Sequence, residues 1–280
     1  MTILLSIIAA VVPTIIYLLV LWQLDRYEKE PLVLFLAAFV WGAVPAVIAS
    51  LILEVIGEYS MVAMPPLGRQ LVGAGLVAPI VEEASKSAAL LVLYWVFRHE
   101  FDGVLDGIIY GAVVGFGFAM TENVFYFESA WAEQGVKGFL MLVLMRAGVF
   151  GLNHAMYTGF TGLGVALFLK IRNRALRFIP LVLGFLLSLG AHALHNALAT
   201  LTGVGGVGAL VAAVLVDWAG VVVLLAVAVG TFFLERKRIL AYADTLVRGQ
   251  VIPESEVSVL KSTFHRRIAR LDLLLKGDVK

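Results

Sequence analysis

Long apolar segments alternate with short polar joints along most of the chain. Seven such segments are predicted, at about residues 2–22, 32–55, 70–97, 103–127, 138–169, 178–200 and 208–234. Each is near or above the roughly 20 residues that an α-helix needs to cross a bilayer. The pattern predicts an all-α, polytopic transmembrane helical bundle of about seven spans. The fifth segment is too long for one straight crossing, and we expect it to tilt, kink or begin as an interfacial helix.

The composition supports a multi-pass protein of the cell membrane. Of 280 residues, 61% are hydrophobic and only 15% are charged. The chain has no cysteine, which excludes disulfides, thiolate catalysis and cysteine-ligated metals. The first segment has no basic stretch before it and no small-residue cleavage site, so we interpret it as a retained span rather than a cleaved signal.

Lysine and arginine residues segregate to alternate joints. The joints after the first, third and fifth segments hold Arg26, Lys29, Arg98, Lys170, Arg172, Arg174 and Arg177. The joints on the other side hold Arg69 and Lys137. Because basic residues favour the cytosolic side, the N-terminus is predicted to lie outside and the C-terminal tail in the cytosol. Within the first joint, residues 25–31 are expected to form a mainly solvated turn.

Two domains are predicted from this pattern. Residues 1–234 would form the transmembrane domain, and residues 235–280 a basic cytosolic tail. Within the tail, an apolar stripe at helical spacing predicts an amphipathic helix that lies on the membrane or on a partner. The stripe consists of Val257, Leu260, Phe264, Ile268, Leu271 and Leu275.

The third segment contains charged residues that are expensive to place in a bilayer. Glu82, Glu83 and Lys86 lie in the middle of its apolar run, and each would cost on the order of 2.5–3.5 kcal/mol to insert. Helical spacing places Lys86 beside both glutamates. Lys86 can therefore pair with one of them while the other faces a different neighbour. An internal salt bridge that only locks a helix is the structural alternative.

Further polar residues occur inside the apolar runs of the next three segments. They are Glu122 and Asn123 in the fourth, Asn153 and His154 in the fifth, and His192, His195 and Asn196 in the sixth. The last three share one side of a helix. The fourth segment also has glycines at 103, 107, 111 and 115, a ladder that lets another helix approach closely.

The polar residues are suited to amide hydrolysis in a water-filled intramembrane cavity. Glu82 or Glu83 would activate water, and Glu122 would be a second acid or an orienting carboxylate. His154, His192 and Asn196 would donate to an oxyanion or, in a metal-dependent version, act as ligands. The chain lacks both a Gly-x-Ser-x-Gly element and a His-Glu-x-x-His helix.

The order of these motifs resembles the PrsW family of intramembrane proteases. The resemblance rests on Glu82-Glu83-x-x-Lys86, Phe118-x-x-x-Glu122-Asn123, His154 and His192-x-x-His195-Asn196. It covers roughly residues 20–200, so the seventh segment and the tail lie beyond it. More distantly, the chain resembles the CAAX-protease and bacteriocin-processing superfamily, whose first motif is also a glutamate pair.

The resemblance implies a protease that cuts a single-span membrane protein, as in the extracytoplasmic first cleavage of an anti-sigma factor. The implied site residues are Glu82, Glu83, Lys86, Glu122, Asn123, His154, His192, His195 and Asn196. No cofactor is expected in the glutamate-dependent version. A zinc-dependent version would draw its ligands from Glu82, Glu83, Glu122, His154, His192 and His195. Partners are the substrate and the lipid bilayer, and no nucleic-acid motif is present.

Two other functional classes fit parts of the pattern. Intramembrane carboxylates and histidines also form relays in proton- or cation-coupled transporters, although the chain shows no obvious inverted repeat. A non-catalytic membrane scaffold that presents its tail to a cytosolic partner is the third class. A protease would lose cleavage when its site is disrupted, and a transporter would lose ion flux. A scaffold would lose function only when its tail is removed, so these readouts distinguish the three classes.

The predicted orientation can be tested with reporter fusions. A reporter fused after Lys280 should report the cytosol, and one inserted between Glu128 and Lys137 should report the outside. A tail located outside would contradict the seven-span interpretation.

Overall fold

The computed structural model describes residues 2–24, 29–101, 103–253, 257 and 259. Internal contacts divide the chain into two units. Of the described residues, the larger unit takes in 2–24 and 30–228, and the smaller unit takes in residue 29 and those from 229 onward. The candidate site lies entirely within the larger unit.

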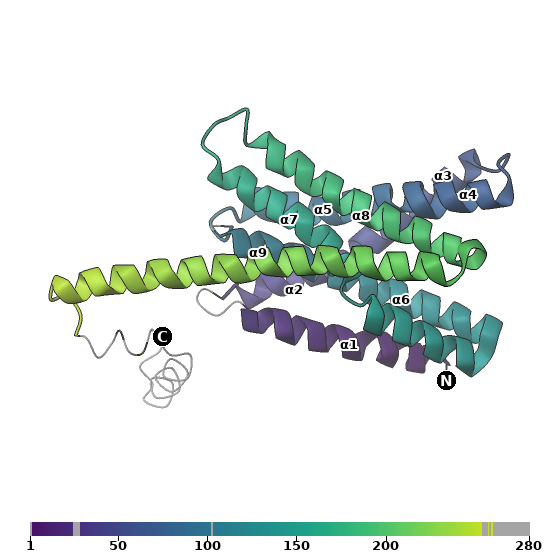
Figure 1. Cartoon of the computed structure of the whole chain (residues 1–280), viewed down its shortest axis with the longest axis horizontal. Helices are drawn as coiled ribbons and strands as arrows, with labels where there is room; N and C mark the ends of the chain where they lie inside the picture. The colour runs from purple at the N-terminus through teal and green to yellow at the C-terminus, as the bar shows by residue number, and fades with distance from the viewer. Residues whose placement is uncertain (1, 25–28, 102, 254–256, 258, 260–280) are drawn as a thin grey trace. The chain divides into compact units, whose positions relative to one another are not determined.

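The regular structure of the described residues is helical throughout (Figure 1), which confirms the predicted all-α fold. The elements are α1 (Thr2–Leu24), α2 (Leu32–Trp41), η1 (Gly42–Ala46), α3 (Val47–Ser60), α4 (Pro66–Val72), η2 (Gly73–Val77), α5 (Ala78–Val96), α6 (Val104–Val143), η3 (Leu144–Val149), α7 (Asn153–Lys170), α8 (Phe178–Gly205) and α9 (Val207–Arg248).

Five helical stretches of the described residues are long and apolar enough to cross a membrane. They are Thr2–Gln23, Leu32–Ser60, Val104–Lys170, Phe178–Gly203 and Val207–Arg248. The α4–α5 stretch, which holds the charged Glu82–Lys86 sequence, is not among the five. Val104–Lys170 has 67 residues and contains the predicted fourth and fifth segments. The seven-span count and the orientation therefore stay predictions.

The 67-residue stretch turns at one glycine. Gly135 has φ 64°, a left-handed conformation that glycine adopts without a Cβ clash. Phe139 then packs against Phe127, with ring centroids 5.9 Å apart, so the chain folds back on itself. A second break follows, where the π-helical η3 ends at Val149 and a turn precedes α7 at Asn153. The fifth segment is thus broken rather than straight.

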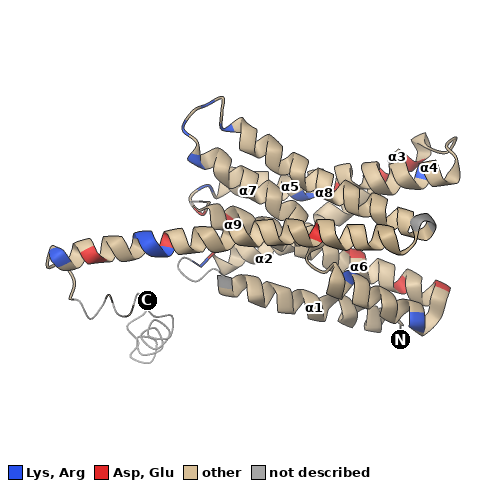
Figure 2. Ribbon diagram, viewed as in Figure 1, with Lys and Arg blue, Asp and Glu red and all other residues tan. Residues whose placement is uncertain are grey.

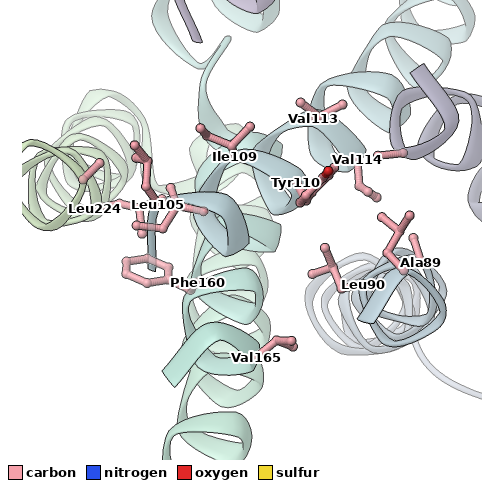
Figure 3. Packing of buried hydrophobic residues seen from close by; sticks show 14 of the residues in the cluster. Ala89, Leu90, Leu105, Ile109, Tyr110, Val113, Val114, Phe160, Val165 and Leu224 are labelled. Carbon is pink, nitrogen blue, oxygen red and sulfur yellow. The ribbon is translucent and has the colours of Figure 1, made fainter. Parts of the chain in front are cut away.

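The core of the larger unit is built around the first half of α6. Figure 3 shows side chains of α5, α6, α7 and α9 gathered in one hydrophobic cluster. The glycine ladder explains how closely α6 approaches α7. A Cβ placed on Gly111 would lie 2.5 Å from the carbonyl oxygen of Thr158, and one on Gly115 would collide with that of His154. This close approach confirms the packing role that the spacing predicts, and it fixes α7 beside the site.

Besides η3, two π-helical turns interrupt long helices of the larger unit. Pro45 lies inside η1, where its missing backbone N–H removes a regular helical hydrogen bond. The second, η2, joins α4 to α5 and contains Gly73 and Gly75. Figure 2 shows that the helices are mainly uncharged along their length. The few charged residues within them include those of the candidate site.

The joints and the tail differ in part from the expected pattern. Glu30, expected in a solvated turn, is buried, and the Tyr110 hydroxyl donates a hydrogen bond of 2.5 Å to its carboxylate. Helix α9 continues to Arg248, well past the predicted end of the seventh segment. Residues 25–28 of the first joint, and most of the predicted tail helix, at 254–256, 258 and 260–280, lie outside the described residues.

Candidate active site

An ammonium group lies between the two adjacent carboxylates of α5. The Lys86 Nζ is 3.1 Å from Glu82 Oε2 and 2.7 Å from Glu83 Oε1. Lys86 and Glu83 are fully buried, and Glu82 is 5% exposed. Lys86 therefore pairs with both glutamates at once. Both positions lie within reach because they are three and four residues away on the same helical face.

The two glutamates nevertheless have different surroundings. Glu83 accepts hydrogen bonds from the hydroxyls of Ser188 at 2.8 Å and Thr158 at 3.1 Å, in addition to its contact with Lys86. Its Oε1 also lies 2.9 Å from His192 Nδ1. Glu82 faces a cavity, and Lys86 is its one hydrogen-bond partner among the described residues. Glu83 is held in place by four neighbours, whereas Glu82 is open to a reactant.

Two imidazoles complete the group around Lys86. His154 Nδ1 lies 3.1 Å from the Lys86 ammonium, and His154 Nε2 lies 2.9 Å from Glu122 Oε2. The rings of His154 and His192 have centroids 5.1 Å apart and meet edge to face. The fold thus brings together residues from α5, α6, α7 and α8 that the sequence separates by more than one hundred positions.

The donor atoms of four of these residues suit a metal ion. Single ligand atoms of Glu82, Glu83, His154 and His192 all lie within 4.8 Å of one another. Two carboxylates and two imidazoles form a donor set that zinc accepts in tetrahedral sites. The Lys86 ammonium lies within 3.1 Å of three of the four, so the same donors already surround a positive charge.

The group of four leaves out two of the expected zinc ligands, Glu122 and His195. Glu122 contacts His154 and the Arg146 guanidinium, a carboxylate–histidine contact of the kind that orients metal-binding imidazoles. Arg146 Nε also donates to Asn123 Oδ1 at 2.7 Å, and the guanidinium lies over the Tyr126 ring. Asn123 therefore helps to fix Arg146 rather than facing the glutamate pair.

His195 belongs to a second polar network. Its Nδ1 lies 2.6 Å from Asp217 Oδ2, on α9. Asn153 donates to the same oxygen at 2.9 Å, and the Tyr157 hydroxyl lies 3.3 Å from Asp217 Oδ1. The sequence reasoning did not single out Asp217, although it is an aspartate within an otherwise apolar segment. That isolation in a membrane-spanning run was the signal that could have identified it.

A cavity of about 810 Å³ leads to Glu82. Its walls come from α3, α4, η2, α5, α6 and α8, and Glu82, Glu122 and Asn196 all line it. Asn196 also donates a hydrogen bond of 2.8 Å to the carbonyl oxygen of Ala74. The volume falls in the range of sites that bind small molecules or peptide segments. Glu54, a further carboxylate that the sequence reasoning missed, lines the same cavity.

Comparison with known proteins identifies the family. Residues 30–231 match the model of a family described as "PrsW family intramembrane metalloprotease". The chain belongs to the PrsW family. The match extends past the predicted limit near residue 200, so the expectation that the seventh segment lies beyond the family region is wrong. Asp217 lies inside it.

Three curated relatives are each named "Protease PrsW". The protein from Geobacillus kaustophilus is 32% identical over 152 residues, which are 54% of this chain and 64% of the relative. That from Clostridioides difficile is 31% identical over 43% of this chain and 49% of the relative. That from Bacillus subtilis is 29% identical over 54% of this chain and 66% of the relative. The matches thus span between about half and two thirds of those proteins, and no solved structure matches the chain.

Lys86 is expected to be essential for the stability of this site. Replacing it in a Lys86→Met variant leaves two buried carboxylates without their cation, which typically costs about 3–5 kcal/mol when a buried ion pair is broken. Thermal unfolding of the purified protein with chelator present should show a clear drop in the midpoint. Lys137→Met, at an exposed position, is the control and should unfold like the parent. An unchanged midpoint in Lys86→Met would contradict the ammonium's structural role.

Proposed function

We propose that this protein is an intramembrane endopeptidase that hydrolyses a peptide bond of a membrane-anchored substrate near its extracytoplasmic boundary. The observation that carries the proposal is Glu82, a carboxylate at the wall of a cavity inside an apolar helical bundle. Membership of the PrsW family and three relatives named as proteases support the same reaction class. Polar groups at membrane depth are tolerated where they line a water-filled space.

Glu82 is the group that would activate water. It faces the cavity, whereas Glu83 has its oxygens occupied by neighbours. A water molecule in the cavity would give a proton to the Glu82 carboxylate as its oxygen attacks the scissile carbonyl carbon. Glu82 would then return that proton to the amide nitrogen as the carbon–nitrogen bond breaks. Hydrolysis thus consumes one water and leaves the carboxylate as it began.

The remaining residues would hold Glu82 and the substrate in place. Lys86 fixes both carboxylates of α5, and Glu83 in turn fixes His192. Asn196 lines the cavity and uses one amide N–H on Ala74. Since a side-chain amide carries two N–H bonds, Asn196 has a second one to offer to an oxyanion. Glu122, which also lines the cavity, orients His154 through its contact with Nε2.

The group formed by Glu82, Glu83, His154 and His192 would hold a zinc ion if the protein follows its family's description. Bound there, zinc would supply Lewis-acid assistance to the carbonyl oxygen and to water. In the metal-free protein the Lys86 ammonium supplies the positive charge that these donors surround. The sensitivity of cleavage to chelators therefore distinguishes the two versions of the mechanism.

The location of the cavity supports cleavage on the extracytoplasmic side. Its lining includes Glu58, Tyr59, Met61 and Arg69, around the connection between α3 and α4. The segregation of basic residues predicts that this connection lies outside the cell. A single-span substrate would therefore present its extracytoplasmic end to the cavity. Cleavage of an anti-sigma factor is the particular case that the family resemblance favours.

Purified protein mixed with single-span substrates tests this proposal. Glu82→Gln and Glu83→Gln should each abolish cleavage, because the amide cannot act as a base or balance Lys86. His192→Ala should do the same. Product masses should place the cut at the extracytoplasmic membrane boundary. A zinc-dependent protease would lose activity with chelator and regain it with zinc, whereas a carboxylate protease would keep its activity.

Glu133→Gln is the matched control because this glutamate is exposed. It should cleave like the parent, and all variants should be checked for folding by thermal unfolding. Full activity in the Glu82→Gln, Glu83→Gln double variant, or cleavage on the cytosolic side, would overturn the proposal.

A further inference from the structure

Asp217 is a buried carboxylate with no cationic partner of the Lys or Arg type in the described part of the chain. It is 1% exposed and lies on α9, and none of its hydrogen bonds within the described residues joins it to Glu82, Glu83 or Lys86. Three side chains contact it: Asn153 at 2.9 Å, His195 at 2.6 Å and Tyr157 at 3.3 Å. All of these residues belong to the larger unit, and two of them lie on α7.

Tyr157 connects this network to the candidate active site. Its ring stacks on that of His192, with centroids 4.7 Å apart and planes 14° from parallel. The same ring meets His154 edge to face at 5.7 Å. Tyr157 is 1% exposed, so its ring has little room to move. The Tyr157 ring therefore contacts both imidazoles of the site, and its hydroxyl contacts Asp217.

We infer that Asp217 is a positioning residue that holds Tyr157, and through it the imidazole of His192, in the arrangement that hydrolysis requires. The carboxylate accepts the Tyr157 hydroxyl hydrogen bond and fixes the tilt of the ring. The ring then restricts His192 by stacking on one face of its imidazole. The effect on catalysis rests on the proposed function, but the effect on His192 does not.

The cost of burying Asp217 favours this role over simple packing. A buried carboxylate without a neutralising cation is expensive, and an apolar residue of similar size is often as stable or more so. Three donors from two different helices converge on it instead. Polar groups of this kind specify one geometry, and the geometry specified here is that of α7 and α8 against α9.

The first readout follows the His192 ring directly. In the parent, stacking on Tyr157 should shield the His192 ring protons, and histidine-labelled protein should show this as an upfield NMR shift, assigned by its loss in His192→Gln. In Asp217→Ala the shift should be reduced and the signal broadened. Asp217→Asn should restore it, because the asparagine oxygen still accepts from Tyr157 while its two amide N–H bonds donate to the other tautomer of His195 and to the oxygen of a flipped Asn153 amide. An unchanged His192 signal in Asp217→Ala would overturn the inference.

The second readout is the split between kcat and KM. Asp217→Ala should lower kcat by about 10–100-fold, the order expected when a reacting group is displaced by a fraction of an ångström to one ångström, with KM within about twofold. Asp244→Ala, which removes an exposed aspartate from the same helix, is the control and should match the parent. A rise in KM alone would contradict a positioning role.

A double-mutant cycle identifies the route. Tyr157→Phe keeps the ring and removes the hydroxyl, so it should lower kcat to a similar extent, and adding Asp217→Ala should then cost little more. Fully additive losses would show that Asp217 does not act through Tyr157. Absence of cleavage by the parent would refute the proposed function, but the NMR result would still decide this inference.

Discussion

The arrangement depends on the burial of one ammonium group among carboxylates and imidazoles. Lys86 has no exposed surface and contacts Glu82, Glu83 and His154. In an apolar bundle these charges are acceptable only together, because removing any one leaves its partners uncompensated. The charges therefore require the helices that carry them to meet at one place. α5 supplies the ammonium and both carboxylates, and α6, α7 and α8 provide the groups around them.

Backbone features make this meeting possible. The glycines of α6 let α7 approach until its carbonyl oxygens occupy the space that side chains would fill. That approach places His154 and Thr158 next to Glu83 and Lys86. On the other side, the π-helical η2 and the end of α3 leave the cavity that reaches Glu82. One side of the carboxylate pair is closed by packing, and the other is open to reactants.

Much of the fold and of the candidate site could be predicted from residue spacing. Apolar runs indicated an all-α bundle. Ionisable residues are costly inside such runs and usually mark a functional site, which identified Glu82, Glu83, Lys86, His154 and His192 as candidates. Spacing within a helix could not separate Glu82 from Glu83, since that difference depends on Ser188 and Thr158, which come from other helices. Nor could it reveal Asp217 as a partner of Tyr157, because the contact joins positions 60 residues apart. Local periodicity specifies faces of helices, whereas the pairing of faces is a property of the packed bundle.

The central claim is that water reaches Glu82 from the extracytoplasmic side through the cavity. The absence of cysteine allows a direct measurement with single-cysteine variants and a membrane-impermeant thiol reagent applied to either side. Ala78 lines the cavity one helical turn before Glu82, whereas Ile80 is exposed on α5 and is not part of the cavity lining. Ala78→Cys should be labelled from the extracytoplasmic side, and Ile80→Cys, facing lipid, should be protected. Protection of Ala78→Cys, or its labelling only from the cytosolic side, would contradict the account.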